Sequence, residues 1–173
     1  MSPRPEPTQQ ERVLGEDDFI VSKTDLKGII TYGNRIFIDI SGYSESELLG
    51  SPHNILRHPD MPRAVFKLLW DTLQAKREIN AYVKNLAKDG SFYWVFANIT
   101  PSFDTRGDVA GYYSVRRKPR AEAIQTANGL YRAMLDAERK AGDGQAGMAA
   151  SMAILNRLLE EKGMDYDEFV LGL

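Results

Sequence analysis

The sequence has no cysteine, which excludes disulfides, thiolate metal sites, covalent c-type haem attachment and a cysteine nucleophile. No apolar run approaches the ~20 residues of a membrane span, and the N-terminus has no hydrophobic signal core. We therefore expect a cytoplasmic chain without direct membrane insertion. Lys and Arg number 22 against 24 Asp and Glu, so the basic excess typical of nucleic-acid binding is missing and nucleic acid is not an expected partner.

The motifs of common enzymes are also missing. The chain has no glycine-rich phosphate loop, no HExxH, no G-x-S-x-G and no kinase signature. Paired acids at 17–18 and 160–161 are interpreted as solvated surface charges. We therefore predict no catalytic residue and no metal site, and expect a protein that is not an enzyme.

Histidine is scarce, and both copies lie in one stretch, HNILRHPDMP, residues 53–62. Pro52, Pro59 and Pro62 exclude a long regular helix here, because each removes a backbone donor and restricts the preceding residue. The stretch is predicted to be a loop with short helical turns. An isolated histidine is most often a surface residue or a hydrogen-bonded core residue, so the cluster alone does not define a site.

Three regions follow from the patterning: a flexible arm at 1–17, a folded domain at 18–119 and C-terminal helices at 120–173. In the domain, two short strands (FIVSKTD and GIITYGN) precede a helix capped by Asn34 and an amphipathic helix at 62–74. Three strands joined by Asp-Gly and Gly-Asp turns complete it. This order predicts an α+β fold, a five-stranded antiparallel sheet with helices on one face.

The C-terminal region shows two amphipathic helices separated by AGDGQAG at 141–147, followed by a final turn capped by Asp165. Two interpretations stay open. The helices fold back onto the sheet, or their Met- and Leu-rich faces bind a partner or a second copy and act as an output arm.

The pattern N-x-x-F-x-x-x-S-G-Y-x-x-x-E-L-x-G, from Asn34 to Gly50, resembles the signature of PAS sensor domains. The strings SPHNILRHPDMP, VKNLAKDGSFYWVFAN and GYYSVRR are similar to the PAS domains of bacterial aerotaxis and energy-taxis receptors. The similarity spans residues 19–118, and the PHN-x-x-RHPDMP string is its most specific part. The resemblance implies a PAS fold that senses redox or energy state through noncovalently bound FAD.

Several side chains suit a flavin nucleotide. Arg57 can bind phosphate oxygens, and His53 and His58 can donate to phosphate, ribose or ring. Asn85 shares a strand face with apolar residues, so its amide needs a partner, either the ring's pyrimidine edge or the backbone of the following turn. The full set of cofactor-binding residues that the resemblance implies is Asn34, His53, Asn54, Arg57, His58, Asp60, Phe66, Trp70, Ile79, Tyr82, Asn85, Trp94 and Asn98. Asn34 equally suits helix capping.

Two features depart from flavin-binding relatives. Ile79 stands where aerotaxis PAS domains commonly carry Trp, and the absence of cysteine excludes the light-driven thiol adduct of other flavin PAS domains. Two alternatives to FAD stay open, a haem gas sensor with His53 or His58 as axial ligand and a cofactor-free dimerisation adaptor.

The chain ends before the membrane anchor and signalling region of single-chain aerotaxis receptors. It resembles the free-standing PAS partner of bipartite energy-taxis receptors. This implies a membrane-bound chemoreceptor or signalling protein as partner, with membrane association only through it. A homodimer through N- or C-terminal helices is a further expectation.

Overall fold

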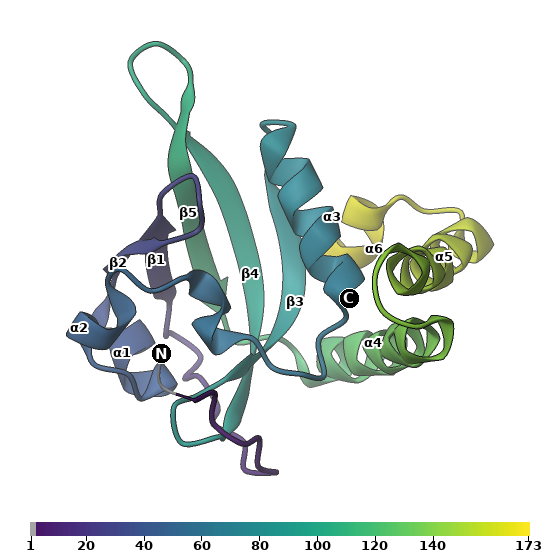
Figure 1. The fold of residues 1–173 in the computed structure, drawn as a ribbon, viewed down its shortest axis with the longest axis horizontal. Helices are drawn as coiled ribbons and strands as arrows, with labels where there is room; N and C mark the ends of the chain where they lie inside the picture. Colours follow the sequence, from purple (N-terminus) through teal and green to yellow (C-terminus); the bar gives the residue numbers. More distant parts are fainter. Residues whose placement is uncertain (1–2) are drawn as a thin grey trace.

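A five-stranded antiparallel sheet organises the protein, in a computed structural model that describes residues 3–173 (Figure 1). The strand order is β2-β1-β5-β4-β3, so β2 and β3 form the two edges. The strands are β1 (Ile20–Thr24), β2 (Ile30–Gly33), β3 (Ile79–Leu86), β4 (Phe92–Phe103) and β5 (Val109–Arg117). The predicted α+β fold and sheet are confirmed.

Four short helical elements between β2 and β3 lie over one face of the sheet (Figure 1). Asn34 caps the first of them, since its side-chain oxygen accepts a hydrogen bond from the Phe37 amide at 3.2 Å. Pro62 directly precedes the longest, and the proline-rich stretch forms only a short 3-10 helix, as predicted. The elements are α1 (Arg35–Ser41), α2 (Glu45–Leu48), η1 (His53–Leu56) and α3 (Arg63–Gln74).

The strand register decides which side chains share a face. Ala81 pairs with Ala97, which in turn pairs with Arg116 on β5. Because side chains alternate along a strand, the odd-numbered residues of β3 and β4 and the even-numbered residues of β5 form one continuous surface. We call this surface, which faces α1, η1 and α3, the inner face. The even-numbered residues of β3 and β4 lie on the outer face.

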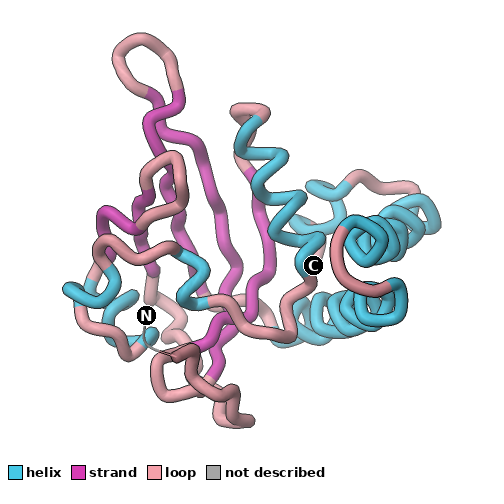
Figure 2. The backbone as a smooth tube through the Cα atoms, in the orientation of Figure 1, coloured by secondary structure: helices cyan, strands magenta, loops and turns pink. Residues whose placement is uncertain are grey.

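The C-terminal helices lie beside the β3 edge of the sheet (Figure 2), where α6 contacts β3 and α5 contacts α3. Tyr131 stacks on Trp94 with ring centroids 6.3 Å apart, and its hydroxyl donates to the Tyr82 carbonyl at 2.7 Å. Of the two arrangements that the sequence leaves open, the structure shows the one in which the C-terminal helices fold back onto the sheet. Within residues 3–173 no helix combines the length and the apolar character that crossing a membrane requires. The helices are α4 (Ala121–Ala141), α5 (Gln145–Lys162) and α6 (Tyr166–Leu171).

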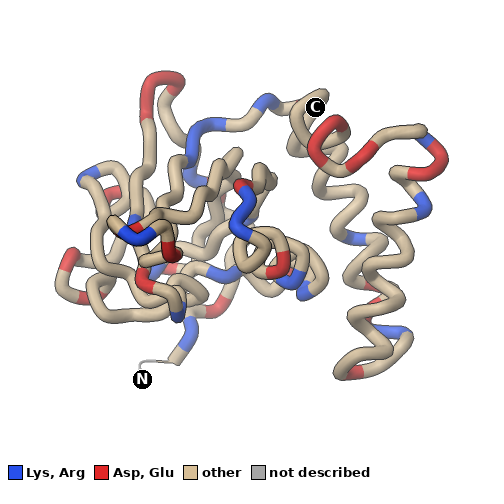
Figure 3. The backbone as a smooth tube through the Cα atoms, turned by 90° about the horizontal axis from the view of Figure 1, so that it is seen from above, with Lys and Arg blue, Asp and Glu red and all other residues tan. Residues whose placement is uncertain are grey.

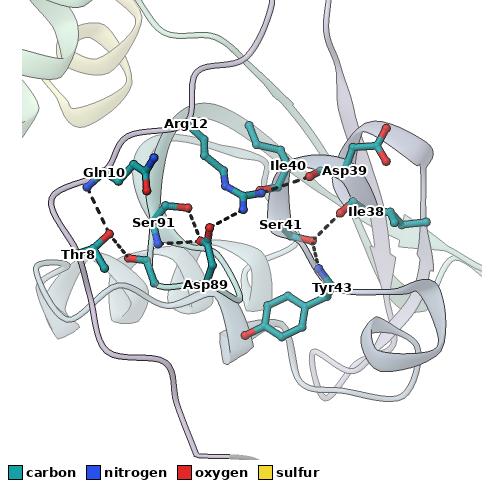
Figure 4. A network of polar contacts seen from close by, with 11 residues as sticks. Thr8, Gln10, Arg12, Ile38, Asp39, Ile40, Ser41, Tyr43, Asp89 and Ser91 are labelled. Carbon is teal, nitrogen blue, oxygen red and sulfur yellow. Dashed lines mark hydrogen bonds and ion pairs between the residues drawn. The ribbon is translucent and has the colours of Figure 1, made fainter.

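Residues 3–14 form what we call the N-terminal strap. The sequence predicts a flexible arm here, but the strap is bonded to the turn between β3 and β4 and to the start of β4. The Arg12 amide donates to the Phe92 carbonyl at 2.8 Å, and the Phe92 amide donates to the Gln10 carbonyl at 2.9 Å. The Arg12 guanidinium donates to the Ile40 carbonyl at 3.0 Å and pairs with Asp89 at 2.8 Å (Figure 4). These long-range backbone bonds explain why a polar, proline-rich composition still gives an ordered segment.

Gly90, in the turn between β3 and β4, lies directly under the strap. Its φ of +89° is in the left-handed region that favours glycine. Its carbonyl accepts from the Thr8 amide at 2.8 Å, and a Cβ at this position would collide with the carbonyl oxygen of Glu6. The strap can dock only because this turn residue has no side chain.

Candidate functional site

A cavity of about 620 Å³ lies between the inner face of the sheet and the helices η1 and α3. Its volume is within the ~300–1,000 Å³ typical of small-molecule sites. Its apolar walls come from two periodic patterns: α3 presents one helical stripe, and β3 and β4 present alternate residues. The apolar residues of these walls are Phe66, Leu69, Trp70, Leu73, Val83, Val95, Ala97 and Ile99.

The charged residues around the cavity are all cationic. Lys and Arg are interspersed with Asp and Glu over the molecule as a whole (Figure 3), and the net charge is −2. Among the described residues that line the cavity, however, no carboxylate occurs. A site with this charge distribution favours an anionic ligand. The cations are Lys27, Arg57, Arg63, Lys67 and Arg116.

Asn85 brings a buried amide to the same cavity. It is 5% exposed, and its side chain makes no hydrogen bond to the described residues. An amide that opens onto a largely apolar cavity offers both a donor and an acceptor, so a ligand that satisfies both gains specificity as well as affinity. Its main chain forms an isolated bridge with Arg57, which fixes the proline-rich loop against β3.

Arg57 is held at the cavity by an aromatic ring rather than by a carboxylate. Its guanidinium carbon lies 4.5 Å from the centroid of the Phe66 ring, a cation–π contact. Burial, with Arg4 nearby, lowers the pKa of Arg57, yet the group stays protonated at neutral pH. Its donors therefore suit phosphate oxygens. Asn54, the next cavity residue toward the N-terminus, accepts from Arg4 through its carbonyl at 2.9 Å.

His53 is half-buried at the inner end of the cavity. Its Nε2 atom lies 3.3 Å from both the Ser22 hydroxyl and an Arg116 nitrogen, and its ring stacks on Phe37 with centroids 6.0 Å apart. Burial and the neighbouring Arg116 lower the pKa of His53 to about 3. The imidazole is therefore neutral at pH 7 and acts as a hydrogen-bonding group rather than as a cation.

His58 and Asp60, both predicted to bind the cofactor, do not line the cavity. His58 is 3% exposed, and its Nδ1 accepts from the Asp60 amide at 3.0 Å. Burial, with Lys84 nearby, lowers the pKa of His58 to about 4. The Asp60 carboxylate pairs with Lys84 at 2.8 Å. Both side chains hold the loop in place and do not line the site.

Five further predicted residues also lie elsewhere. Asn34 uses its amide to cap α1 and to donate to the Phe19 carbonyl at 2.8 Å. Tyr82, Trp94 and Asn98 have even parity and therefore lie on the outer face, against or near the C-terminal helices. Ile79 is on the inner face and packs against the cavity residues Leu69, Leu73 and Tyr112, but it does not itself line the cavity. The predicted residues that the structure brings together at the cavity are His53, Asn54, Arg57, Phe66, Trp70 and Asn85.

Arg116 is the main cavity residue that the sequence reasoning missed. It is 2% exposed and shares the inner face with Tyr112 and Ser114, two residues apart along β5. That parity was the available signal, because an arginine on the core-facing side of a strand is unusual. Met148, on α5, also lines the cavity, and only the tertiary packing of the C-terminal helices reveals it.

The family model for the PAS fold matches residues 30–116. The chain belongs to the PAS family. Over 134 residues, 78% of its length, this PAS chain is 42% identical to the aerotaxis receptor of Escherichia coli. It is 32% identical over 97 residues, 56% of its length, to a nitrogen fixation regulatory protein of Klebsiella pneumoniae. It spans only 26% and 20% of the lengths of these relatives.

Solved structures show the same fold. A structure described as "Flavin Analogue Sheds Light on Light-Oxygen-Voltage Domain Mechanism" superposes with a TM-score of 0.56 at 25% identity. The match covers 62% of this PAS chain and 81% of that one. The dark structure of the blue-light photoreceptor Aureochrome1 LOV has a TM-score of 0.55 at 22% identity. The match covers 68% of this chain and 96% of that one, and at this identity it shows a similarity of fold only. Together these relatives are sensors and regulators, so this PAS domain belongs to a class of signal-sensing modules rather than a typically catalytic one.

Proposed function

We propose that this PAS domain binds FAD noncovalently in the cavity and senses redox or energy state through it. The observation that carries the proposal is the unpartnered amide of Asn85, which faces a cavity lined by cations and apolar rings but by no carboxylate. A flavin nucleotide combines a ring whose edge both donates and accepts hydrogen bonds with a strongly anionic phosphate chain. The relative that is an aerotaxis receptor supports a flavin-based sensor.

The residues present fit the parts of such a ligand. Arg57, Arg63 and Lys67, near the start of α3, suit the phosphates, because guanidinium groups bind phosphate oxygens in pairs. Phe66 and Trp70 on α3 supply aromatic surface for the ring. Bound flavin supplies a group that can be reduced and reoxidised, while the chain binds it, orients it and keeps water from it.

The contacts of His53 favour this ligand over haem. Haem iron would need a free imidazole nitrogen, but Nε2 of His53 lies 3.3 Å from a cationic nitrogen of Arg116. His58, the other histidine, does not line the cavity. Within the described residues, the cavity therefore offers one imidazole, and that imidazole is already engaged.

The proposal extends to the response. The bound state of the cavity is relayed through the C-terminal helices to a membrane-bound chemoreceptor or signalling protein in the cytoplasm, and the domain itself carries out no catalysis. Met148 supports this route, because it belongs to α5 and lines the cavity. A second copy of the chain, joined through its N- or C-terminal segments, is the proposed assembly.

The test is to purify the chain, reconstitute it with FAD and record its visible absorbance before and after dithionite. We expect retained flavin absorbance that bleaches on reduction. Asn85→Leu should weaken flavin binding by roughly 5- to 150-fold, since it removes ring contacts worth ~1–3 kcal/mol and leaves flavin groups unpaired. Asn98→Leu is the matched control, because Asn98 lies on the outer face of the neighbouring strand.

A wild-type protein that retains no flavin would refute the proposal. A Soret band would favour the haem alternative, and a colourless protein that dimerises would favour the adaptor. Equal losses in the Asn85 and Asn98 variants would mean that instability, rather than ligand contact, explains the result.

A further inference from the structure

Arg116 is a buried cation without a counter-charge in the described chain. It is 2% exposed and forms no ion pair with any described carboxylate. One terminal nitrogen donates to the Ser22 hydroxyl at 2.6 Å, and the guanidinium carbon lies 4.7 Å from the centroid of the Phe37 ring. Its Nε is buried and has no hydrogen-bond partner.

This arrangement is costly for the protein alone. A buried charge is normally paired, and a buried donor without a partner adds to the cost. The neighbours do not neutralise Arg116: Ser22 and Phe37 are uncharged, and His53 is held neutral. Tyr93, whose hydroxyl is buried without a hydrogen-bond partner, adds no charge of its own at neutral pH. The missing negative charge is therefore expected to come from a ligand in the cavity that Arg116 lines.

We propose that Arg116, with His53 and Ser22, forms an anion-recognition site at the inner end of the cavity, which stabilises negative charge in the ring of the bound ligand. It is distinct from the outer cations Arg57, Arg63 and Lys67, which lie in α3 and in the loop before it and which we assign to the phosphates. The ligand class is an aromatic heterocycle that becomes anionic when it is reduced. This inference rests on the proposed flavin function.

The charge balance is simple. Reduction by a two-electron donor such as dithionite adds two electrons and one proton from water to the neutral oxidised ring, which leaves one negative charge in the ring. A nearby guanidinium stabilises this product more than the neutral oxidised ring. Arg116 therefore makes the domain bind the reduced ligand more tightly, relative to the oxidised ligand, than an uncharged residue would.

The experiment compares Arg116→Met with Arg117→Met in the full chain reconstituted with FAD. Arg117 is the adjacent arginine on the outer face, 5.2 Å from the Phe96 ring centroid, so both variants remove one positive charge. The readout is the ratio of the dissociation constants of dithionite-reduced and oxidised FAD, measured anaerobically at pH 8. We expect Arg116→Met to shift this ratio against the reduced form by about tenfold or more, equivalent to about 1.4 kcal/mol, and Arg117→Met to leave it unchanged.

Two additional variants separate charge from packing. Arg116→Lys retains the charge and should restore most of the ratio, whereas Arg116→Gln retains a donor without charge and should behave like Arg116→Met. If Arg116→Met does not fold, the Lys and Gln variants decide the question by the same ratio. The ligand-free unfolding temperature should not fall in Arg116→Gln, because the variant removes an uncompensated buried charge.

The outcomes distinguish the two proposals. A wild type that retains no FAD refutes the proposed function and this inference with it. A wild type that retains FAD, with the same ratio in Arg116→Met or Arg116→Gln, overturns the anion-recognition site and leaves the flavin proposal intact. A ratio that changes equally in the Arg117 variant also overturns it, because the effect would then be one of overall charge.

Discussion

His58 is buried and His53 is half-buried, and both are held neutral by their surroundings. Burial lowers the pKa of each, and a neighbouring cation lowers it further: Arg116 beside His53 and Lys84 beside His58. The pKa is about 3 for His53 and about 4 for His58, well below the ordinary 6.5. Each imidazole therefore favours the folded state only in its unprotonated form.

These shifts predict a loss of stability in mild acid. Between pH 6.5 and about 4 the unfolded chain takes up a proton on each histidine, whereas the folded chain does not. The free energy of unfolding should therefore fall as the pH falls through this window, by up to about 1.4 kcal/mol per pH unit for each histidine. Urea unfolding at pH 7, 6 and 5 measures it.

His58→Asn is the control for this dependence. The Asn oxygen can accept the Asp60 amide hydrogen bond in place of Nδ1 but does not titrate. The slope of stability against pH should drop to about half, since one of two titrating groups is lost. A wild type that is equally stable at pH 7 and pH 5 would contradict the expected protonation behaviour.

Residue-scale prediction from sequence worked where local chemistry decides. Asn34 suited both helix capping and ligand binding, and the cap is what the structure shows. The alternation of side chains along β3 predicts the face that carries Asn85. The same alternation places Tyr82 on the opposite face. Parity could have marked Arg116 as core-facing, but its place in the cavity depends on the register of β5 with β1 and β4, which the sequence does not show.

At the scale of elements, α3 depends on a residue far away in the sequence. Pro62 offers no side-chain cap to the first turn of α3. Glu138 of α4, 5% exposed, supplies it: one carboxylate oxygen accepts from the Ala64 amide at 3.1 Å, and the other lies 3.6 Å from Nε of Arg63. The C-terminal helices are thus fastened to the helix that carries Phe66 and Trp70.

Glu138→Ala should lower the free energy of unfolding by about 1–3 kcal/mol, because it leaves the buried amide of Ala64 without a partner. Hydrogen exchange should increase first in the opening turn of α3. Asp136→Ala, two residues away and exposed, is the control and should change stability by less than about 0.5 kcal/mol. Equal effects in chemical denaturation would show that the contact has no special role.

The elements themselves were predictable because their signals are local: turn glycines, the alternation of the strands and the stripe of α3. The capping aspartate of α6 was predicted in the same way, and Asp165 accepts from the Glu168 amide at 2.8 Å. The strap and the Glu138 contact were not predictable. Both join segments more than 70 residues apart, for which a single sequence carries no spacing signal.

At the scale of the whole molecule, the C-terminal helices touch both the sheet and the cavity. Tyr131 and Tyr166 donate to carbonyl groups of β3, at 2.7 and 2.8 Å, while Met148 lines the cavity. A change in what the cavity holds can therefore alter the packing of α5, provided the two ligand states prefer different arrangements. This is the physical content of the proposed relay.

Hydrogen exchange of the FAD-loaded chain, oxidised against dithionite-reduced, tests that relay. We expect the first half of α5, residues 145–155, to differ in protection between the two states, because Met148 lies there. The turn at 104–108, which does not line the cavity, should be unchanged and serves as the internal control. Identical protection of α4 and α5 in both states would refute transmission through these helices.

The contact between Gly90 and the strap restricts the residue at the turn. A methyl group there would occupy the place of the Glu6 carbonyl oxygen, and because this is a backbone atom that every residue type has, replacing Glu6 would not relieve the collision. A relative with any larger residue at this turn must route the beginning of its chain along another path. The identity of one turn residue therefore indicates whether a homologue can dock its leading segment in the same way.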